Sequence, residues 1–251
     1  MKRIITDTNI WYSITQEQVD EILKSYRIVV PITVLSELYT SPNLFRSNET
    51  LDSLKSAVKI LLYNARFVEF IRYDPFEYLL KDIKKDLSPR LSIAWYLNEF
   101  EMLKNLTLEK LSKQHPERFD VSRLTKFINE QSIMYKDRVD ENKQYFKKLD
   151  TTEFTIKFIL KLANDNLHQL NSTFPIIENL TDDYQLLVKS LNELLREISR
   201  STQKLQDNDW IDMFNLTYVG KEDLYWTLEK SKKRLIDCVG LSHHLFNYGS
   251  S

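Results

Sequence analysis

The first 85 residues alternate short apolar runs with longer amphipathic stretches. The apolar runs predict buried strands at residues 3–6, 28–30 and 67–71. Around them, apolar positions recur every three or four residues, which predicts helices at residues 15–26, 31–41, 49–64 and 75–83. Strands and helices in alternation are typical of an α/β fold with a parallel sheet.

The pattern changes in the middle of the chain. Residues 86–202 contain no strand pattern but several long amphipathic segments, which predict a large all-α insertion. After it, the sequence predicts a helix at residues 205–219, a strand at 223–226 and a basic helix at 229–237. We therefore expect one α/β domain formed by residues 1–85 and 203–251, interrupted by the helical segment 86–202.

The composition of the chain argues against several classes of protein. Only 3 Gly and 6 Pro in 251 residues argue against a turn-rich all-β fold and against a glycine-rich phosphate loop. A net charge of −1 means that binding to nucleic acid would need a local basic patch. The chain has no apolar run long enough to span a bilayer and an N-terminus that turns polar at once, so we expect a cytoplasmic protein without a membrane partner.

Acidic residues stand where predicted elements meet. Asp7 ends the first strand, Glu37 lies on the helix after the second, and Glu229 follows the last. Three more acids surround the start of the helix after the insertion: Asp207, Asp209 and Asp212. The carboxyl ends of parallel strands share one edge of a sheet, so these acids can converge there. Clustered carboxylates repel one another unless a cation joins them, and oxygen ligands select Mg²⁺ or Mn²⁺, ions that can support phosphodiester hydrolysis.

The ordered set of acids resembles the PIN-domain nucleases. The matching segments are Asp7-Thr8-Asn9 after a strand, Glu37 within residues 29–38, Asp209 within residues 208–213, and Thr227-Leu228-Glu229 at a strand end. The resemblance covers about residues 1–85 and 203–251, and it implies a three-layer α/β/α fold with a central parallel sheet. It departs from the family pattern at Glu229, where the family usually has Asp.

The resemblance also implies roles for these residues. Asp7, Glu37 and Asp209 would be catalytic ligands of Mg²⁺ or Mn²⁺, and Glu229 a direct or water-mediated one. Asp212 lies three residues after Asp209 on the same helix face, so either or both could point into the site, with Asp207 as a helix cap. The residues that would order the site are Thr8, Asn9 and Thr227.

A basic cluster directly follows the last acid. It consists of Lys230, Lys232, Lys233 and Arg234, which could contact substrate phosphates or simply form a solvated helix face. We expect a metal-dependent endonuclease acting on RNA, with DNA not excluded, and the family resemblance implies a toxin, defence or RNA-processing role with an antitoxin or regulatory protein as partner. The apolar helices of the insertion would suit a homodimer. The alternative is a catalytically degenerate scaffold whose insertion docks a partner protein.

Overall fold

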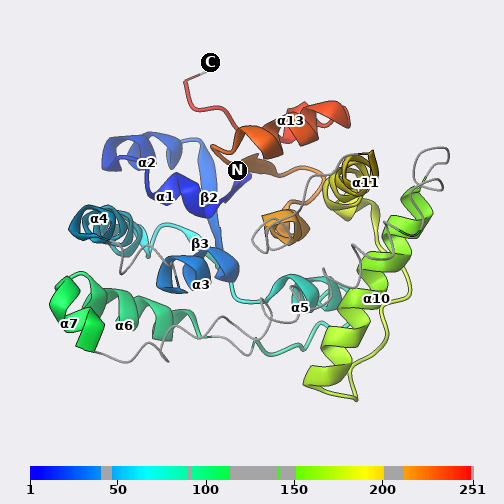
Figure 1. Ribbon diagram of the computed structural model, residues 1–251, viewed down its shortest axis with the longest axis horizontal. Helices are drawn as coiled ribbons and strands as arrows, with labels where there is room; N and C mark the ends of the chain where they lie inside the picture. The colour runs from blue at the N-terminus through cyan, green and yellow to red at the C-terminus, as the bar shows by residue number, and fades with distance from the viewer. Residues whose placement is uncertain (41–46, 90–91, 114–140, 142–150, 201–211, 250–251) are drawn as a thin grey trace.

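A four-stranded sheet lies between two layers of helices (Figure 1). The computed structural model describes residues 1–40, 47–89, 92–113, 141, 151–200 and 212–249. The strands are β1 (Lys2–Thr6), β2 (Tyr26–Pro31), β3 (Glu69–Ile71) and β4 (Leu224–Trp226). The α/β class and the parallel sheet predicted from the sequence are confirmed.

The order of the strands places β1 in the interior of the sheet. The order is β3-β2-β1-β4, and every neighbouring pair is parallel. Ile5 of β1 is aligned with Val29 of β2 on one side and with Tyr225 of β4 on the other. The chain therefore runs outward from β1 through β2 to β3, and returns only at its end to add β4 on the opposite side. The direction in which successive strands are added to the sheet therefore reverses between β1 and β4.

One face of the sheet packs against helices from the first half of the chain. Alternate strand residues such as Ile4, Ile28 and Trp226 are buried on this face. The helices that pack here are α1 (Thr8–Trp11), α2 (Gln16–Ile22), α3 (Ile32–Thr40), α4 (Asn48–Asn64) and α6 (Ile93–Leu103), followed by α7 (Leu108–Lys113).

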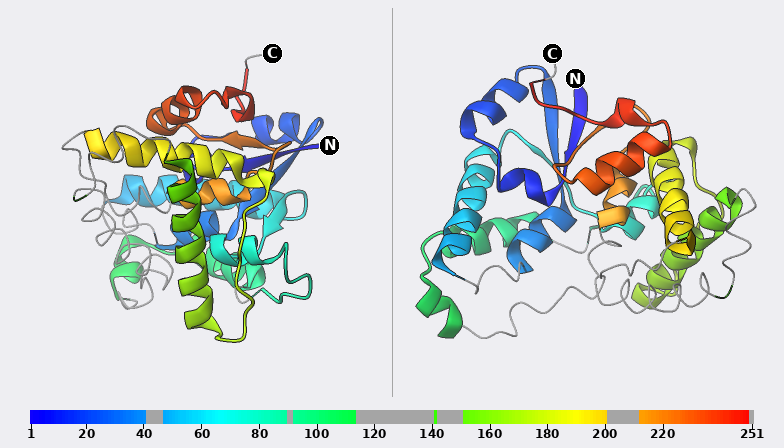
Figure 2. Two further views of the ribbon diagram at one scale, coloured as in Figure 1. Left: turned by 90° about the vertical axis from the view of Figure 1, so that its right-hand side faces the viewer. Right: turned by 45° about the horizontal axis from the view of Figure 1, so that its top comes forward.

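The other face packs against a short helix at residues 75–80 and against helices from the middle and the end of the chain (Figure 2). The intervening strand residues Ile5, Val29 and Tyr225 are buried here. The surrounding elements are α5 (Pro75–Leu80), α10 (Thr152–Leu170), α11 (Gln185–Arg200), α13 (Lys230–Cys238) and the 3₁₀ helices η3 (Asp182–Tyr184), η4 (Asn215–Tyr218) and η5 (Ser242–His244). Since strand side chains alternate between faces, a single run of apolar residues supplies both halves of the core.

Several element ends differ from the sequence predictions. The capping box predicted at Thr15 is present, but α2 ends at Ile22 because Tyr26 already pairs with Lys2 in the sheet. Pro31 is the last residue of β2 and not the first of a helix. The third strand starts at Glu69, because the two residues before it donate backbone hydrogen bonds to Asn64 and close α4. Part of the helix predicted at 205–219 lies outside the described residues.

The segment 86–202 contributes helices to both layers. Its helix α6 packs against α3 and α4, whereas α10 packs against α5 and α11 on the opposite face. Phe158, Ile159 and Leu162 of α10 belong to the same buried cluster as Ile5 of the central strand. Among the residues that the structure describes, none of the helices has the length and apolar character required to cross a lipid bilayer.

The packing of α10 predicts that it unfolds together with the sheet. Ile159 is fully buried, so Ile159→Ala removes apolar contacts and leaves a cavity. We expect the free energy of unfolding to fall by about 2–5 kcal/mol in a single transition, monitored by circular dichroism and tryptophan fluorescence in urea. Ile176→Ala, at a residue that is 71% exposed, is the matched control and should change stability by about 0.5 kcal/mol or less. Two separate transitions, with only one shifted by Ile159→Ala, would show that α10 folds independently.

Candidate metal centre

The candidate site lies where β1 and β4 end side by side. Asp7 directly follows β1, and its backbone N–H donates to the carbonyl of Trp226, the last residue of β4, at 2.9 Å. Asp7 also caps the N-terminus of α1. In open parallel sheets, ligands bind outside the carboxyl ends of the strands where the strand order reverses. The reversal between β1 and β4 places Asp7 at this position.

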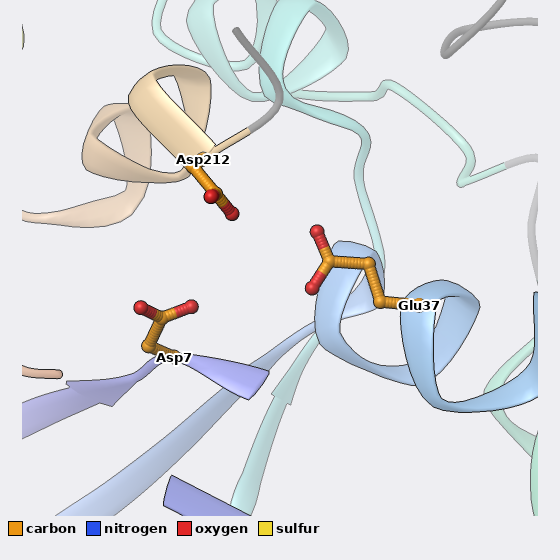
Figure 3. A group of neighbouring side chains, drawn as sticks. All are labelled: Asp7, Glu37 and Asp212. Atoms are coloured by element: carbon orange, nitrogen blue, oxygen red, sulfur yellow. The ribbon is translucent and has the colours of Figure 1, made fainter. Parts of the chain in front are cut away.

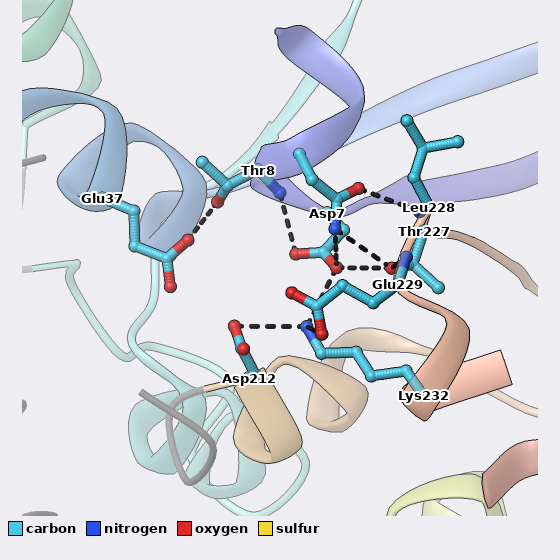
Figure 4. A network of polar contacts seen from close by, with 9 residues as sticks. Asp7, Thr8, Glu37, Asp212, Thr227, Leu228, Glu229 and Lys232 are labelled. Atoms are coloured by element: carbon cyan, nitrogen blue, oxygen red, sulfur yellow. Dashed lines mark hydrogen bonds and ion pairs between the residues drawn. The ribbon is translucent and has the colours of Figure 1, made fainter. Parts of the chain in front are cut away.

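The carboxylate of Asp7 accepts hydrogen bonds from four residues (Figure 4). Its Oδ1 accepts from the backbone N–H of Thr8 at 2.8 Å. Its Oδ2 accepts from the Thr227 hydroxyl at 2.7 Å, from Lys232 Nζ at 2.9 Å and from Asn9 Nδ2 at 3.0 Å. These donors come from segments far apart in the sequence, so Asp7 holds the site together.

Two of the predicted ordering residues also fix the turn between β4 and α13. Asn9 Oδ1 accepts from the backbone N–H of Leu228 at 3.0 Å, and its Nδ2 lies 3.3 Å from the Thr227 hydroxyl. That hydroxyl in turn accepts from the backbone N–H of Glu229 at 3.1 Å. The structure thus places Thr8, Asn9 and Thr227 in contact with Asp7.

Three carboxylates converge in front of the sheet edge. One oxygen from each of Asp7, Glu37 and Asp212 lies within 4.8 Å of the other two, and Figure 3 shows the three side chains pointing toward one another. Asp7 is buried, whereas the other two are partly exposed. Glu37 comes from α3, where the Thr8 hydroxyl donates to its Oε2, and Asp212 comes from the helical turn before η4.

The sequence left three acids as candidates for the third ligand, and the structure describes only one of them, Asp212. Asp207 and Asp209 lie outside the described residues. Asp212 is therefore the acid of that stretch that the structure brings to Asp7 and Glu37.

Lys232 occupies a position that the sequence analysis did not predict. Its ammonium group lies 2.9 Å from Asp7 Oδ2, 3.2 Å from Asp212 Oδ1 and 3.5 Å from Glu229 Oε2. Its side chain is only 9% exposed, so it is not part of a solvated basic face. The missed signal is helical phase, because Lys232 precedes the buried residues Leu235 and Ile236 by three and four positions.

The other members of the basic cluster lie apart from the carboxylates. Lys230 is exposed and Lys233 is partly exposed, so both are accessible to a phosphate. Arg234 instead forms two hydrogen bonds with Glu197 of α11, at 2.6 and 2.8 Å, and its guanidinium joins α13 to α11. This ion pair competes with the predicted phosphate contact of Arg234.

Glu229 contacts Lys232 but does not belong to the group of three convergent acids. It precedes α13 at the N-cap position, and its side chain is 39% exposed. Its carboxylate faces the Lys232 ammonium at 3.5 Å and is not a member of the group of three. The structure therefore does not bring together all of the acids that the sequence predicted as ligands.

The protein environment separates the proton affinities of the three acids. Burial alone would raise the pKa of Asp7, but the charge of Lys232 and the hydrogen bonds from Thr227, Lys232 and Thr8 hold it below its usual value. For Glu37, burial and the nearby charge of Asp212 raise the pKa to about 8. For Asp212, burial and the charges of Asp7 and Glu229 raise it to about 7, although Lys232 opposes this. Without a further cation, the cluster holds protons at neutral pH.

The set of donors fits a hard divalent cation. All three convergent groups are carboxylates, which suit Mg²⁺ and Mn²⁺ and not the softer metals that prefer thiolate or imidazole. Asp7 Oδ1 accepts one hydrogen bond in the described structure and retains a lone pair for coordination. A cation placed among the three acids would favour their charged forms, so metal binding would release protons.

The raised pKa of Glu37 predicts that the metal-free protein loses stability as pH rises. Between pH 4.5 and about 8, the Glu37 carboxyl is more fully protonated in the folded protein than in the unfolded chain. The free energy of unfolding therefore falls as pH rises through this window. Glu37→Gln cannot ionise, and its carbonyl can still accept from Thr8. We expect this variant to be more stable than the wild type by about 1 kcal/mol at pH 8, with a smaller difference at pH 5, in urea unfolding with a chelator present.

The control for this measurement is Asp183→Asn, at an exposed residue outside the cluster. Its stability relative to the wild type should not vary between pH 5 and pH 8. The account of Glu37 fails if Glu37→Gln has the same advantage over the wild type at both pH values, or none.

No protein-family model matches the chain, and no curated protein or solved structure is significantly similar to it. The comparisons therefore assign neither a family nor an activity. Function has to be inferred from the residues of the site and from their place in the fold.

Proposed function

We propose that this protein is a Mg²⁺- or Mn²⁺-dependent nuclease that hydrolyses phosphodiester bonds at the carboxylates of Asp7, Glu37 and Asp212. The observation that carries the proposal is the convergence of these three acids within 4.8 Å at the point where the strand order reverses. The raised pKa values of Glu37 and Asp212 support it, because burial and the neighbouring carboxylates disfavour their charged forms, which a bound cation would stabilise.

The three carboxylates have different roles in the proposed site. Asp7 is fixed by its hydrogen bonds, so it can orient a cation with little loss of side-chain freedom on binding. Glu37 and Asp212 are partly exposed and complete the ligand set. A divalent cation held there would supply charge stabilisation for the phosphate and activation of the attacking water.

Two lysines of α13 are accessible and suited to contacts with a nucleic-acid backbone, and the same helix carries Lys232, which contacts Asp7 and Asp212. Lys230 is the first residue of α13, three positions after Thr227, and Lys233 lies one turn further along the same helix. Contacts between lysine and phosphate give affinity without sequence selectivity. We propose RNA as the substrate, because the resemblance to PIN-domain nucleases implies it, and DNA is the alternative that the same assay tests.

A second function is favoured by Lys232. Its ammonium already neutralises part of the charge of three carboxylates, as a cluster with a purely structural role would require. In that case the protein would be a binding scaffold, and the helices of segment 86–202 would dock a partner protein. Metal binding distinguishes the two proposals, because the scaffold needs no divalent cation.

The direct test is cleavage of labelled single-stranded RNA and DNA with Mg²⁺ or Mn²⁺. We expect cleavage by the wild type to stop with a chelator, and Glu37→Gln and Asp212→Asn to reduce the rate at least about 100-fold, because each removes a charged ligand. Asp183→Asn, on the surface, should cleave like the wild type. Cleavage that persists in both site variants would exclude this site, and a wild type that neither cleaves nor binds metal would favour the scaffold.

A further inference from the structure

Lys232 has the same relation to the carboxylates that a second metal ion would have. In two-metal sites the ions lie about 3.5–4 Å apart and share carboxylate ligands. Lys232 contacts Asp7 Oδ2 and Asp212 Oδ1, so it already shares two of the three acids that converge on the candidate cation site. Glu229, which stands after β4 where the PIN-domain pattern usually has Asp, is the third carboxylate around the ammonium.

The hydrogen bonds of Asp7 leave no room for two metal ions. Each oxygen of a carboxylate offers about two lone-pair sites. Oδ2 accepts from Thr227, Lys232 and Asn9, whereas Oδ1 accepts from Thr8 alone. An ion can therefore bind at Oδ1 without breaking a contact, but an ion at Oδ2 would have to displace the ammonium.

Packing in the core fixes the position of the Lys232 ammonium. Lys232 comes from the buried face of α13 and is 8% exposed. Tyr225 of β4 is fully buried and interacts electrostatically with Lys232, Asp7 and Asp212. The phenol hydroxyl of Tyr225 has no hydrogen-bond partner among the described residues, so it does not compete with Lys232 for the carboxylates.

We propose that Lys232 serves as a built-in cation in place of a second metal ion, so that Asp7, Glu37 and Asp212 bind a single divalent ion. This inference rests on the proposed metal-dependent function and names the metal stoichiometry of that site. Lys232 is then a positioning residue, because it fixes Asp7 and Asp212 and excludes a second ion from the space between them and Glu229. One divalent ion and one ammonium would together set three positive charges against the four negative charges of the acids.

The test is the number of Mn²⁺ ions bound per chain, measured by equilibrium dialysis with metal analysis and by electron paramagnetic resonance. We expect one ion in the wild type, with the spectrum of an isolated Mn²⁺. Lys232→Met removes the charge but keeps an unbranched side chain, and it should bind two ions with a spin-coupled spectrum. Lys230→Met removes a lysine from the exposed face of the same helix and should still bind one ion.

A second variant keeps the test decisive if Lys232→Met does not fold. Lys232→Arg retains the positive charge and should bind one ion, as in the wild type. A wild type that binds two coupled ions, or none, overturns the inference, as does a folded Lys232→Met that still binds one. Cleavage assayed on the same wild-type sample separates this inference from the proposed function: two bound ions with cleavage refute only the inference, and one bound ion without cleavage refutes only the nuclease.

Discussion

The hydrogen bonds to the buried Asp7 carboxylate are the interaction on which the site depends. A buried charge is stable only when it is paired and hydrogen-bonded. Four residues, two from α1, one directly after β4 and one from α13, donate to Asp7 and satisfy this requirement. The same contacts align the end of the central strand with the start of the last helix. Asp7 thus links the folding of two distant parts of the chain to the geometry of the candidate metal centre.

Lys232 compensates the charge of Asp7 more fully than that of Asp212 or Glu37. Lys232 lowers the pKa of Asp7, but Glu37 and Asp212 retain raised pKa values. Such an arrangement costs stability in the metal-free protein, a trade that is common at functional sites. A divalent cation at this position would remove the cost, so the same electrostatics that weaken the empty cluster would strengthen ion binding.

The sequence predicted the parts of the structure that local pattern controls. The strand before Asp7, the capping box at Thr15 and the parallel sheet followed from apolar periodicity and turn residues. The contacts of Thr8, Asn9 and Thr227 with Asp7 agree with the roles implied by the family resemblance, although the family itself stays a prediction. An amphipathic stripe shows that a helix has a buried face but not what it packs against. The sequence therefore did not reveal that the helices of 86–202 cover both faces of the sheet, or that Lys232 turns inward.

The most direct measurement is anomalous diffraction from crystals grown with Mn²⁺. The account predicts a single strong anomalous peak about 2.1 Å from oxygens of Asp7, Glu37 and Asp212, with the Lys232 ammonium still in contact with Asp7. No peak at this cluster while Mn²⁺ is bound elsewhere, or no peak at all at saturating Mn²⁺, would contradict the claim that the three carboxylates form a metal centre.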